Sequence, residues 1–117
     1  GGEAMARASP IELGSRGDVD VGDVRLRPSQ REIAGPAGTV GLEPRVLQLL
    51  LALGDGLGAV LPRDRLLALC WGDAVVGEDA LNRAVAGARR ALRDAGSTRL
   101  SIVTIPRVGY RLQEEAA

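Results

Sequence analysis

A set of five small or aliphatic residues near the C-terminal end constrains the fold of this chain most strongly. They recur at spacings of four, three, four and three: Leu81, Val85, Ala88, Leu92 and Ala95. Residues at these spacings share one face of an α-helix, so the pattern predicts a helix over about 79–95 that packs this face inward. Asp79 is the expected N-cap, because an aspartate oxygen accepts hydrogen bonds from the first turn.

The opposite arc of the same predicted helix is basic. Successive residues of a helix turn by 100°, which places six residues on this arc: Asn82, Arg83, Ala86, Arg89, Arg90 and Arg93. None of them is acidic. Like charges on neighbouring turns repel by a few tenths of a kcal/mol per pair. A face of this kind suits a polyanion, and an α-helix fits the major groove of B-DNA. A basic face that is only solvated is the alternative.

The distribution of charge supports the first interpretation. The chain has 15 basic and 15 acidic residues, and every basic residue is arginine. Residues 82–112 nevertheless hold seven arginines and one acid, Asp94. Clustering of positive charge in one part of a chain is typical of proteins that bind nucleic acid.

Composition excludes several kinds of chemistry. The chain has no histidine and one cysteine, Cys70. An internal disulfide, a zinc site of the usual Cys/His kind and a Ser–His or Cys–His catalytic pair are therefore ruled out. We expect no catalytic residue, no metal and no small-molecule cofactor, and we expect Cys70 to be a small buried hydrophobic residue.

The remaining patterns predict an α+β domain. Residues 18–41 alternate as three short strands around Val19–Leu26, Ile33 and Val40. Leucine-rich helices follow from Pro44 and over about 63–71, with a brief strand at Val60-Leu61 between them. Residues 100–112 form a hairpin that turns at 106–109. Thr104 and Arg107 lie near the tip of this hairpin, where Arg107 is suited to reach a neighbouring groove or backbone.

The chain divides into one domain and two tails. Residues 1–17 are rich in Gly, Ala, Ser and Pro and are expected to be a flexible tail, 18–112 form the domain, and 113–117 form a C-terminal tail. No apolar run is long enough to span a membrane, and no signal peptide is evident, so a cytoplasmic location is expected.

Four blocks of sequence resemble the winged-helix DNA-binding domain of OmpR/PhoB-type response regulators of two-component systems and of their ToxR/CadC-like relatives. The resemblance covers residues 19–112, and the blocks are Leu42-Glu43-Pro44-Arg45, Leu66-Leu67-Ala68-Leu69-Cys70-Trp71-Gly72, 80–94 and Ile102-Val103-Thr104-Ile105-Pro106-Arg107-Val108-Gly109-Tyr110-Arg111-Leu112. It implies a winged helix-turn-helix with an N-terminal antiparallel sheet, a three-helix core and a C-terminal β-hairpin wing.

The resemblance also implies a function, which is sequence-specific binding of double-stranded DNA by a bacterial transcription regulator. The third helix (about 79–95) would enter the major groove, and the wing (about 100–112) would touch the minor groove or backbone. A dimer on DNA, contact with RNA polymerase and a larger parent regulator in the cytoplasm are further implications. The alternative is a winged-helix protein–protein interaction module that does not bind DNA.

Individual roles follow from the matched motifs. Asn82 and Arg83 would reach base edges, Arg89 a phosphate, and Thr104 and Arg107 would belong to the wing. Trp71 and Tyr110 match residues that meet phosphates, although packing at the edge of the core is an equal alternative for both. Gly87 departs from the family pattern at a position often occupied by a polar or basic reader, which weakens direct readout there, and a close backbone approach is one explanation.

Overall fold

The computed structural model describes residues 10–115. The N-terminal part of the domain is a four-stranded antiparallel sheet in the order β1-β2-β3-β4. Its strands are β1 (Val19–Val21), β2 (Val24–Arg27), β3 (Glu32–Gly35) and β4 (Gly38–Gly41). The prediction of three strands here was wrong, because residues 19–27 fold back on themselves at Gly22. This glycine has φ of 54°, a left-handed conformation that lets the chain reverse within two residues.

Three helices follow the sheet: α1 (Pro44–Asp55), α2 (Arg63–Trp71) and α3 (Glu78–Asp94). Pro44 begins α1 as expected. The N-cap of α3 is Gly77 and makes no side-chain hydrogen bond, so the assignment of Asp79 as N-cap was wrong. Among residues 10–115, no helix is both long enough and apolar enough to cross a membrane.

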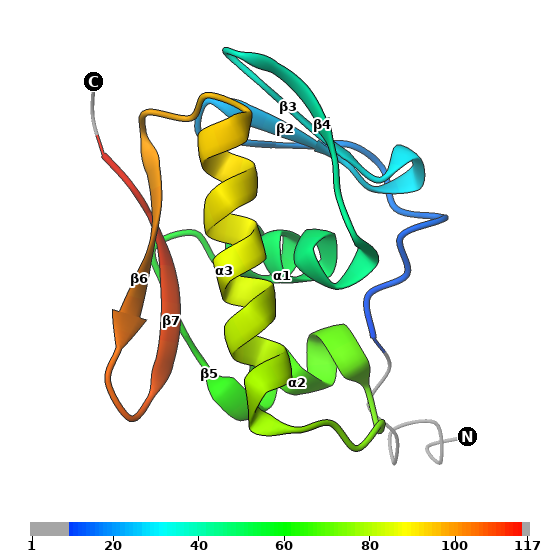
Figure 1. Ribbon diagram of the computed structural model, residues 1–117, viewed down its shortest axis with the longest axis vertical. Coiled ribbons are helices and arrows are strands. Elements are labelled where there is room, and N and C mark those ends of the chain that lie inside the picture. Colours follow the sequence, from blue (N-terminus) through cyan, green and yellow to red (C-terminus); the bar gives the residue numbers. More distant parts are fainter. Residues whose placement is uncertain (1–9, 116–117) are drawn as a thin grey trace.

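A three-stranded sheet closes the fold. The hairpin of β6 (Leu100–Ile105) and β7 (Gly109–Glu114) pairs with β5 (Val60–Pro62) in the order β5-β7-β6. The hairpin is the predicted wing, and it lies beside α3 in Figure 1. Because β7 continues to Glu114, residues 113 and 114 belong to the wing and not to a tail.

The helices enclose the core between the two sheets. Every residue of α1 from Leu47 to Leu53 is buried, and α3 crosses in front of α1 in Figure 1. The predicted inward face of α3 is confirmed, because its five residues are all buried. These elements give the winged helix-turn-helix fold, in the element order that the sequence predicted apart from the additional N-terminal strand.

Residues 10–17, which were predicted to be part of a tail, pack on the domain. The N–H of Ile11 donates to the carbonyl of Leu69 at 2.9 Å, and Nε2 of Gln48 donates to the carbonyl of Ile11 at 2.8 Å. Leu13 is buried in the core, and Arg16 pairs with Asp55. The expectations for residues 1–9 and 116–117 lie outside the described residues.

A polar contact ties the N-terminal sheet to the end of α3. The Ser97 hydroxyl donates to Asp23 at 2.7 Å, and the N–H of Thr98 donates to the other carboxylate oxygen at 2.9 Å. Partial burial acts to raise the pKa of Asp23, but these hydrogen bonds outweigh it and hold the pKa below its usual value. The turn after β1 is thereby fixed against the C-terminal end of α3.

Gly87 lies where α3 crosses α1. A Cβ at this position would lie 2.8 Å from Cγ2 of Val46, which is closer than real Cβ atoms approach a methyl group. The close contact at Gly87 is therefore with a side chain of α1 and not with a backbone segment, and it lies where two helices of the core meet.

We expect Gly87→Ala to destabilise the fold even though alanine favours a helix by about 1 kcal/mol, since overpacking a core costs about 1–3 kcal/mol. In a Val46→Ala background the same change is expected to stabilise by about 1 kcal/mol. Urea unfolding of the four chains of this cycle measures the coupling. Equal effects of Gly87→Ala in both backgrounds would contradict the proposed contact.

We expect the thiol of Cys70 to be unreactive in the native protein. Its side chain is fully buried, and burial raises the pKa to about 12, so almost no thiolate exists near pH 8. A chromogenic disulfide reagent should give no signal from the native chain and one equivalent after denaturation in urea. Rapid labelling without denaturant would show that the site opens.

Candidate nucleic-acid interface

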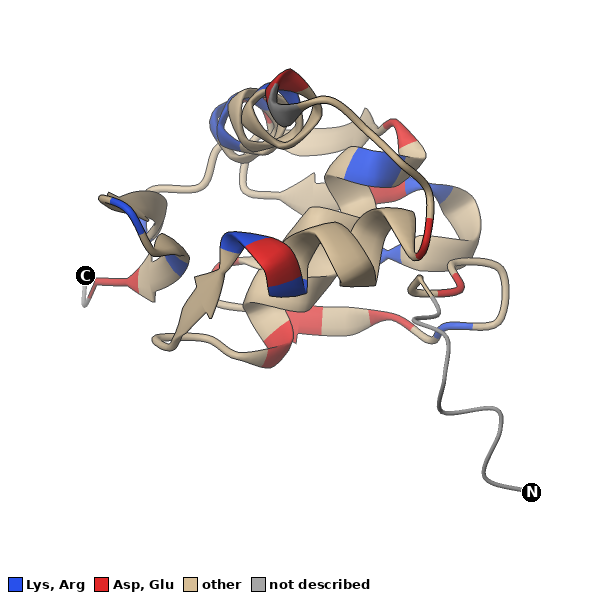
Figure 2. Ribbon diagram, turned by 90° about the horizontal axis from the view of Figure 1, so that it is seen from below, with Lys and Arg blue, Asp and Glu red and all other residues tan. Residues whose placement is uncertain are grey.

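An exposed arc of α3 forms a basic face, which we define as Asn82, Arg83, Ala86, Arg90 and Arg93. Packing of the opposite side of the helix directs this arc outward, and Figure 2 shows α3 nearly end-on with blue residues on the outer part of its circumference. The ion pairs among the described side chains involve other arginines: Arg16, Arg25, Arg27 and Arg99. The arginines of the basic face are thus available to an external anion.

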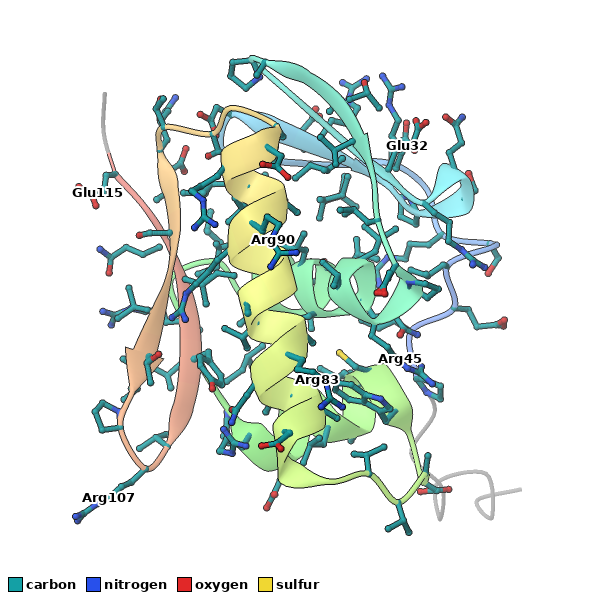
Figure 3. All side chains as sticks on the ribbon, in the orientation of Figure 1. Glu32, Arg45, Arg83, Arg90, Arg107 and Glu115 are labelled. Carbon is teal, nitrogen blue, oxygen red and sulfur yellow. The ribbon has the colours of Figure 1, made fainter. Side chains whose placement is uncertain are left out.

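The tip of the wing adds another exposed cation. Arg107 has φ of 66° in the turn between β6 and β7, and its side chain projects from the tip in Figure 3. Thr104, at the end of β6, is also exposed. Arg83 and Arg90 extend from α3 in the same view, so α3 and the tip of the wing each present exposed positive charge.

Arg89, by contrast, points toward the wing. Its Nε and Nη2 donate to the carbonyl of Ile102 at 3.1 and 2.8 Å, and Nη2 also donates to Oγ1 of Thr104 at 3.1 Å. The side chain is half-buried, whereas the sequence placed it on the exposed arc. Arg89 therefore connects α3 to β6, and only part of its guanidinium remains free to meet a phosphate.

Asn82 belongs to a polar cluster built from three elements. Nη1 of Arg63, the first residue of α2, lies 3.4 Å from Oδ1 of Asn82 and 3.3 Å from the hydroxyl of Tyr110. The Tyr110 hydroxyl in turn donates to Oδ1 of Asn82 at 3.3 Å. Tyr110 is buried, so packing of its ring is established and its hydroxyl is used within the protein.

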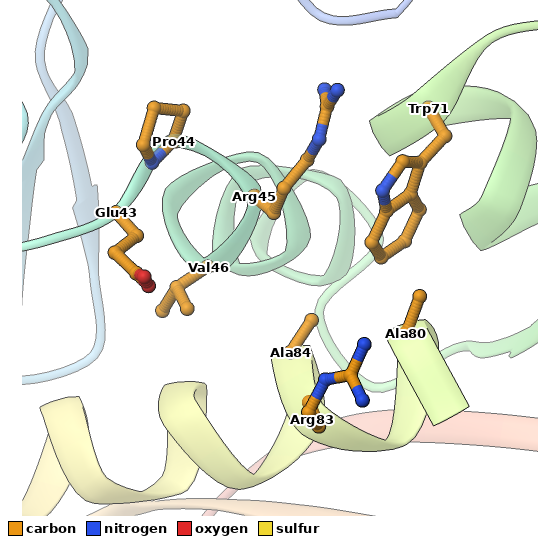
Figure 4. Close-up of a pocket in the computed structure, with 8 residues that line it drawn as sticks. All are labelled: Glu43, Pro44, Arg45, Val46, Trp71, Ala80, Arg83 and Ala84. Atoms are coloured by element: carbon orange, nitrogen blue, oxygen red, sulfur yellow. The ribbon is translucent and has the colours of Figure 1, made fainter. Parts of the chain in front are cut away.

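Trp71 lines a groove on the side of α3 that faces α2 and not the wing. The groove has a volume of about 730 Å³ and is bounded by the start of α1, the end of α2 and the first turns of α3. Figure 4 shows the indole of Trp71 with Arg45 and Arg83 nearby. The guanidinium of Arg45 lies 5.6 Å from the centroid of the Trp71 ring, and Nη1 donates to the carbonyl of Cys70 at 2.6 Å.

The sequence did not identify Arg45 and Arg63 as parts of this surface. Each lies in the first turn of its helix, and no spacing rule relates either one to α3. The remaining predicted residues fall into three groups around the basic face: Thr104, Arg107 and Tyr110 in the wing, Arg89 between wing and helix, and Trp71 in the groove. Not all of the predicted residues are therefore free, since Trp71 and Arg89 are partly buried and Tyr110 is buried.

Comparison with known proteins identifies relatives of this chain. Residues 37–112 match the family described as transcriptional regulatory protein, C terminal. The chain is 30% identical over 95 residues to the transcriptional activator CadC of Escherichia coli, covering 80% of this chain and 19% of CadC. It is 29% identical over 99 residues to the alkaline phosphatase synthesis transcriptional regulatory protein PhoP of Bacillus subtilis, covering 84% of this chain and 41% of PhoP.

Solved structures show the same fold. The DNA-binding domain of E. coli CadC superposes with a TM-score of 0.75 at 29% identity, over 86% of this chain and 94% of that domain. The DNA-binding domain of CpxR from E. coli superposes with a TM-score of 0.71 at 24% identity, over 86% of this chain and all of that domain. The chain spans less than half the length of both CadC and PhoP.

We expect Arg89→Ala to lower the free energy of unfolding by about 1.5–3 kcal/mol, because hydrogen bonds from a charged donor to Ile102 and Thr104 are lost. Arg90→Ala is the matched control; it removes an exposed arginine one position away and should change stability by less than about 0.5 kcal/mol. Urea unfolding measures both. Equal stabilities of the two variants would show that Arg89 does not support the wing.

Proposed function

The chain belongs to the family of C-terminal domains of transcriptional regulatory proteins, and from this premise we propose that it binds double-stranded DNA in a sequence-specific manner. Helix α3 enters the major groove, and the wing contacts the minor groove or the backbone. The observation that carries the proposal is the basic face of α3, whose arginines have no ion-pair partner among the described side chains.

Electrostatics explain why such a face supports binding. Repulsion among Arg83, Arg90 and Arg93 destabilises the isolated fold slightly, and neutralisation by phosphates relieves it. Release of the counterions condensed on DNA then provides affinity that does not depend on sequence. The likeness to the DNA-binding domain of CadC, at 29% identity, supports the same conclusion.

We assign two kinds of DNA contact to this surface, one to base edges and one to phosphates. Asn82 and Arg83, in the first turns of α3, are assigned to base edges, since the N-terminal residues of a recognition helix reach deepest into the groove. Ala86 allows the helix to approach closely. We assign phosphate contacts to Arg90, Arg93, Arg107 and the part of the Arg89 guanidinium that makes no internal hydrogen bond. The groove lined by Arg45 and Trp71 accepts the DNA backbone that runs beside α3.

The wider biological role forms part of the same proposal. A longer regulator carries this domain in the cytoplasm, and two copies bind neighbouring half-sites. The loop between α2 and α3 faces RNA polymerase, and its Val75 side chain is fully exposed. Protein docking without DNA binding is the competing role, and it makes no use of the unpaired basic face.

We expect the chain to shift a random DNA duplex at low salt, with affinity that falls as salt rises. Arg90→Ala, from the helix, and Arg107→Ala, from the wing, should each reduce the slope of log affinity against log salt by about one. Fluorescence anisotropy across a salt series measures this slope.

Arg25→Ala is the control for this experiment. Arg25 is exposed like the other two, but it pairs with Asp20 on the N-terminal sheet, and its removal should leave the slope unchanged. A chain that binds no duplex at low salt would identify a docking module. An unchanged slope in both Arg90→Ala and Arg107→Ala would remove these residues from the interface.

A further inference from the structure

The polar cluster of Arg63, Asn82 and Tyr110 bears on which base Asn82 reads. It joins the first residue of α2, the early part of α3 and β7, and its three hydrogen bonds lie between 3.3 and 3.4 Å. The cluster occupies the side of the basic face that adjoins the wing. Asn82 itself remains exposed, so it is both held from within and accessible from outside.

The chemistry of Arg63 fixes the orientation of the Asn82 amide. A guanidinium only donates hydrogen bonds, so the Asn82 atom that faces Nη1 of Arg63 must be the oxygen. With the amide in the opposite orientation, the N–H donors of Asn82 would face the N–H donors of Arg63. Tyr110 reinforces this arrangement, because its hydroxyl accepts from Arg63 and donates its single proton to the same Asn82 oxygen.

Both acceptor positions of Oδ1 are therefore filled inside the protein. The amide nitrogen has no hydrogen-bond partner among the side chains that the structure describes. The only hydrogen-bonding group that Asn82 can offer to DNA is an N–H donor. An asparagine that reads adenine needs both groups, since its oxygen must accept from N6 while its nitrogen donates to N7.

We propose that the Arg63–Tyr110 pair makes Asn82 a donor-only reader, which selects guanine rather than adenine in the major groove. Guanine presents two acceptors, N7 and O6, whereas adenine presents one acceptor beside an N6 donor that opposes the amide nitrogen. Arg63 and Tyr110 are thus positioning residues that determine specificity without touching the base. This inference rests on the proposed DNA-binding function and specifies one of its contacts.

Two steps test the proposal with the intact chain. Duplexes are selected from a random pool, and the base pair whose preference disappears in Asn82→Ala is the one that Asn82 reads. At that position the unaltered protein should bind guanine about 5- to 150-fold more tightly than adenine, the range expected for one good base contact. Replacing that guanine with 7-deazaguanine, which lacks the N7 acceptor, should weaken binding.

The second step releases the oxygen of Asn82. Arg63→Met combined with Tyr110→Phe removes both internal donors, and the ratio of guanine to adenine affinity should fall by about tenfold or more, within the range of one contact. Arg65→Met is the matched control, because Arg65 is an exposed arginine on the same helix with no bond to Asn82 and should leave the ratio unchanged.

The outcomes separate this inference from the function on which it rests. A chain that binds duplex but prefers adenine at the Asn82 position, or shows no preference that Asn82→Ala removes, overturns the inference alone. A ratio that is unmoved in the double variant also overturns it. A chain that binds no duplex at low salt contradicts the proposed function itself. The guanine-to-adenine ratio and the analogue are both measured with the unaltered protein, so the predicted preference is tested even where the double variant fails to fold.

Discussion

Packing of α3 against α1 is the interaction on which the rest of the structure depends. Small residues make this close contact feasible, since Gly87 leaves room for Val46 and Ala88 is fully buried. Burial of one face of a helix fixes its rotation about its own axis. The basic face is therefore exposed because the apolar face is buried, and no separate interaction is needed to orient it.

The wing is held by polar contacts as well as by apolar packing, since Ile102 and Leu112 are buried in the core. Arg89 connects α3 to the carbonyl of Ile102, and Arg63 joins α2 to Asn82 and Tyr110. In both cases a guanidinium satisfies oxygen atoms on a neighbouring element, which places the hairpin beside the helix at a defined distance. Arginine suits this task because its planar group offers several donors in fixed directions. Arginine thus both positions the elements of this surface and gives the surface its positive charge.

The N-terminal part of the domain is secured in a comparable way. Gln48, a buried polar side chain of α1, donates to the carbonyl of Ile11 and holds the segment before β1 against the helices. Asp23 joins the sheet to the end of α3 through Ser97 and Thr98. These contacts connect residues far apart in the sequence. Neither composition nor periodicity signals them, which is why residues 10–17 resembled a tail.

The sequence by itself determined the helices, the wing and the division of α3 into an apolar and a basic face, because each depends on periodicity that a local segment carries. It also identified the family through motifs of fixed spacing. Only the tertiary structure decided which arginines are free. The Arg89 side chain bonds to the wing, Arg45 and Arg63 belong to the surface around α3, and the acceptor positions of Asn82 Oδ1 are occupied within the protein. Each of these outcomes depends on hydrogen-bond partners 13 to 28 residues away. Hydrogen-bond partners at such separations are set by how the elements pack, and no local pattern in the chain encodes them.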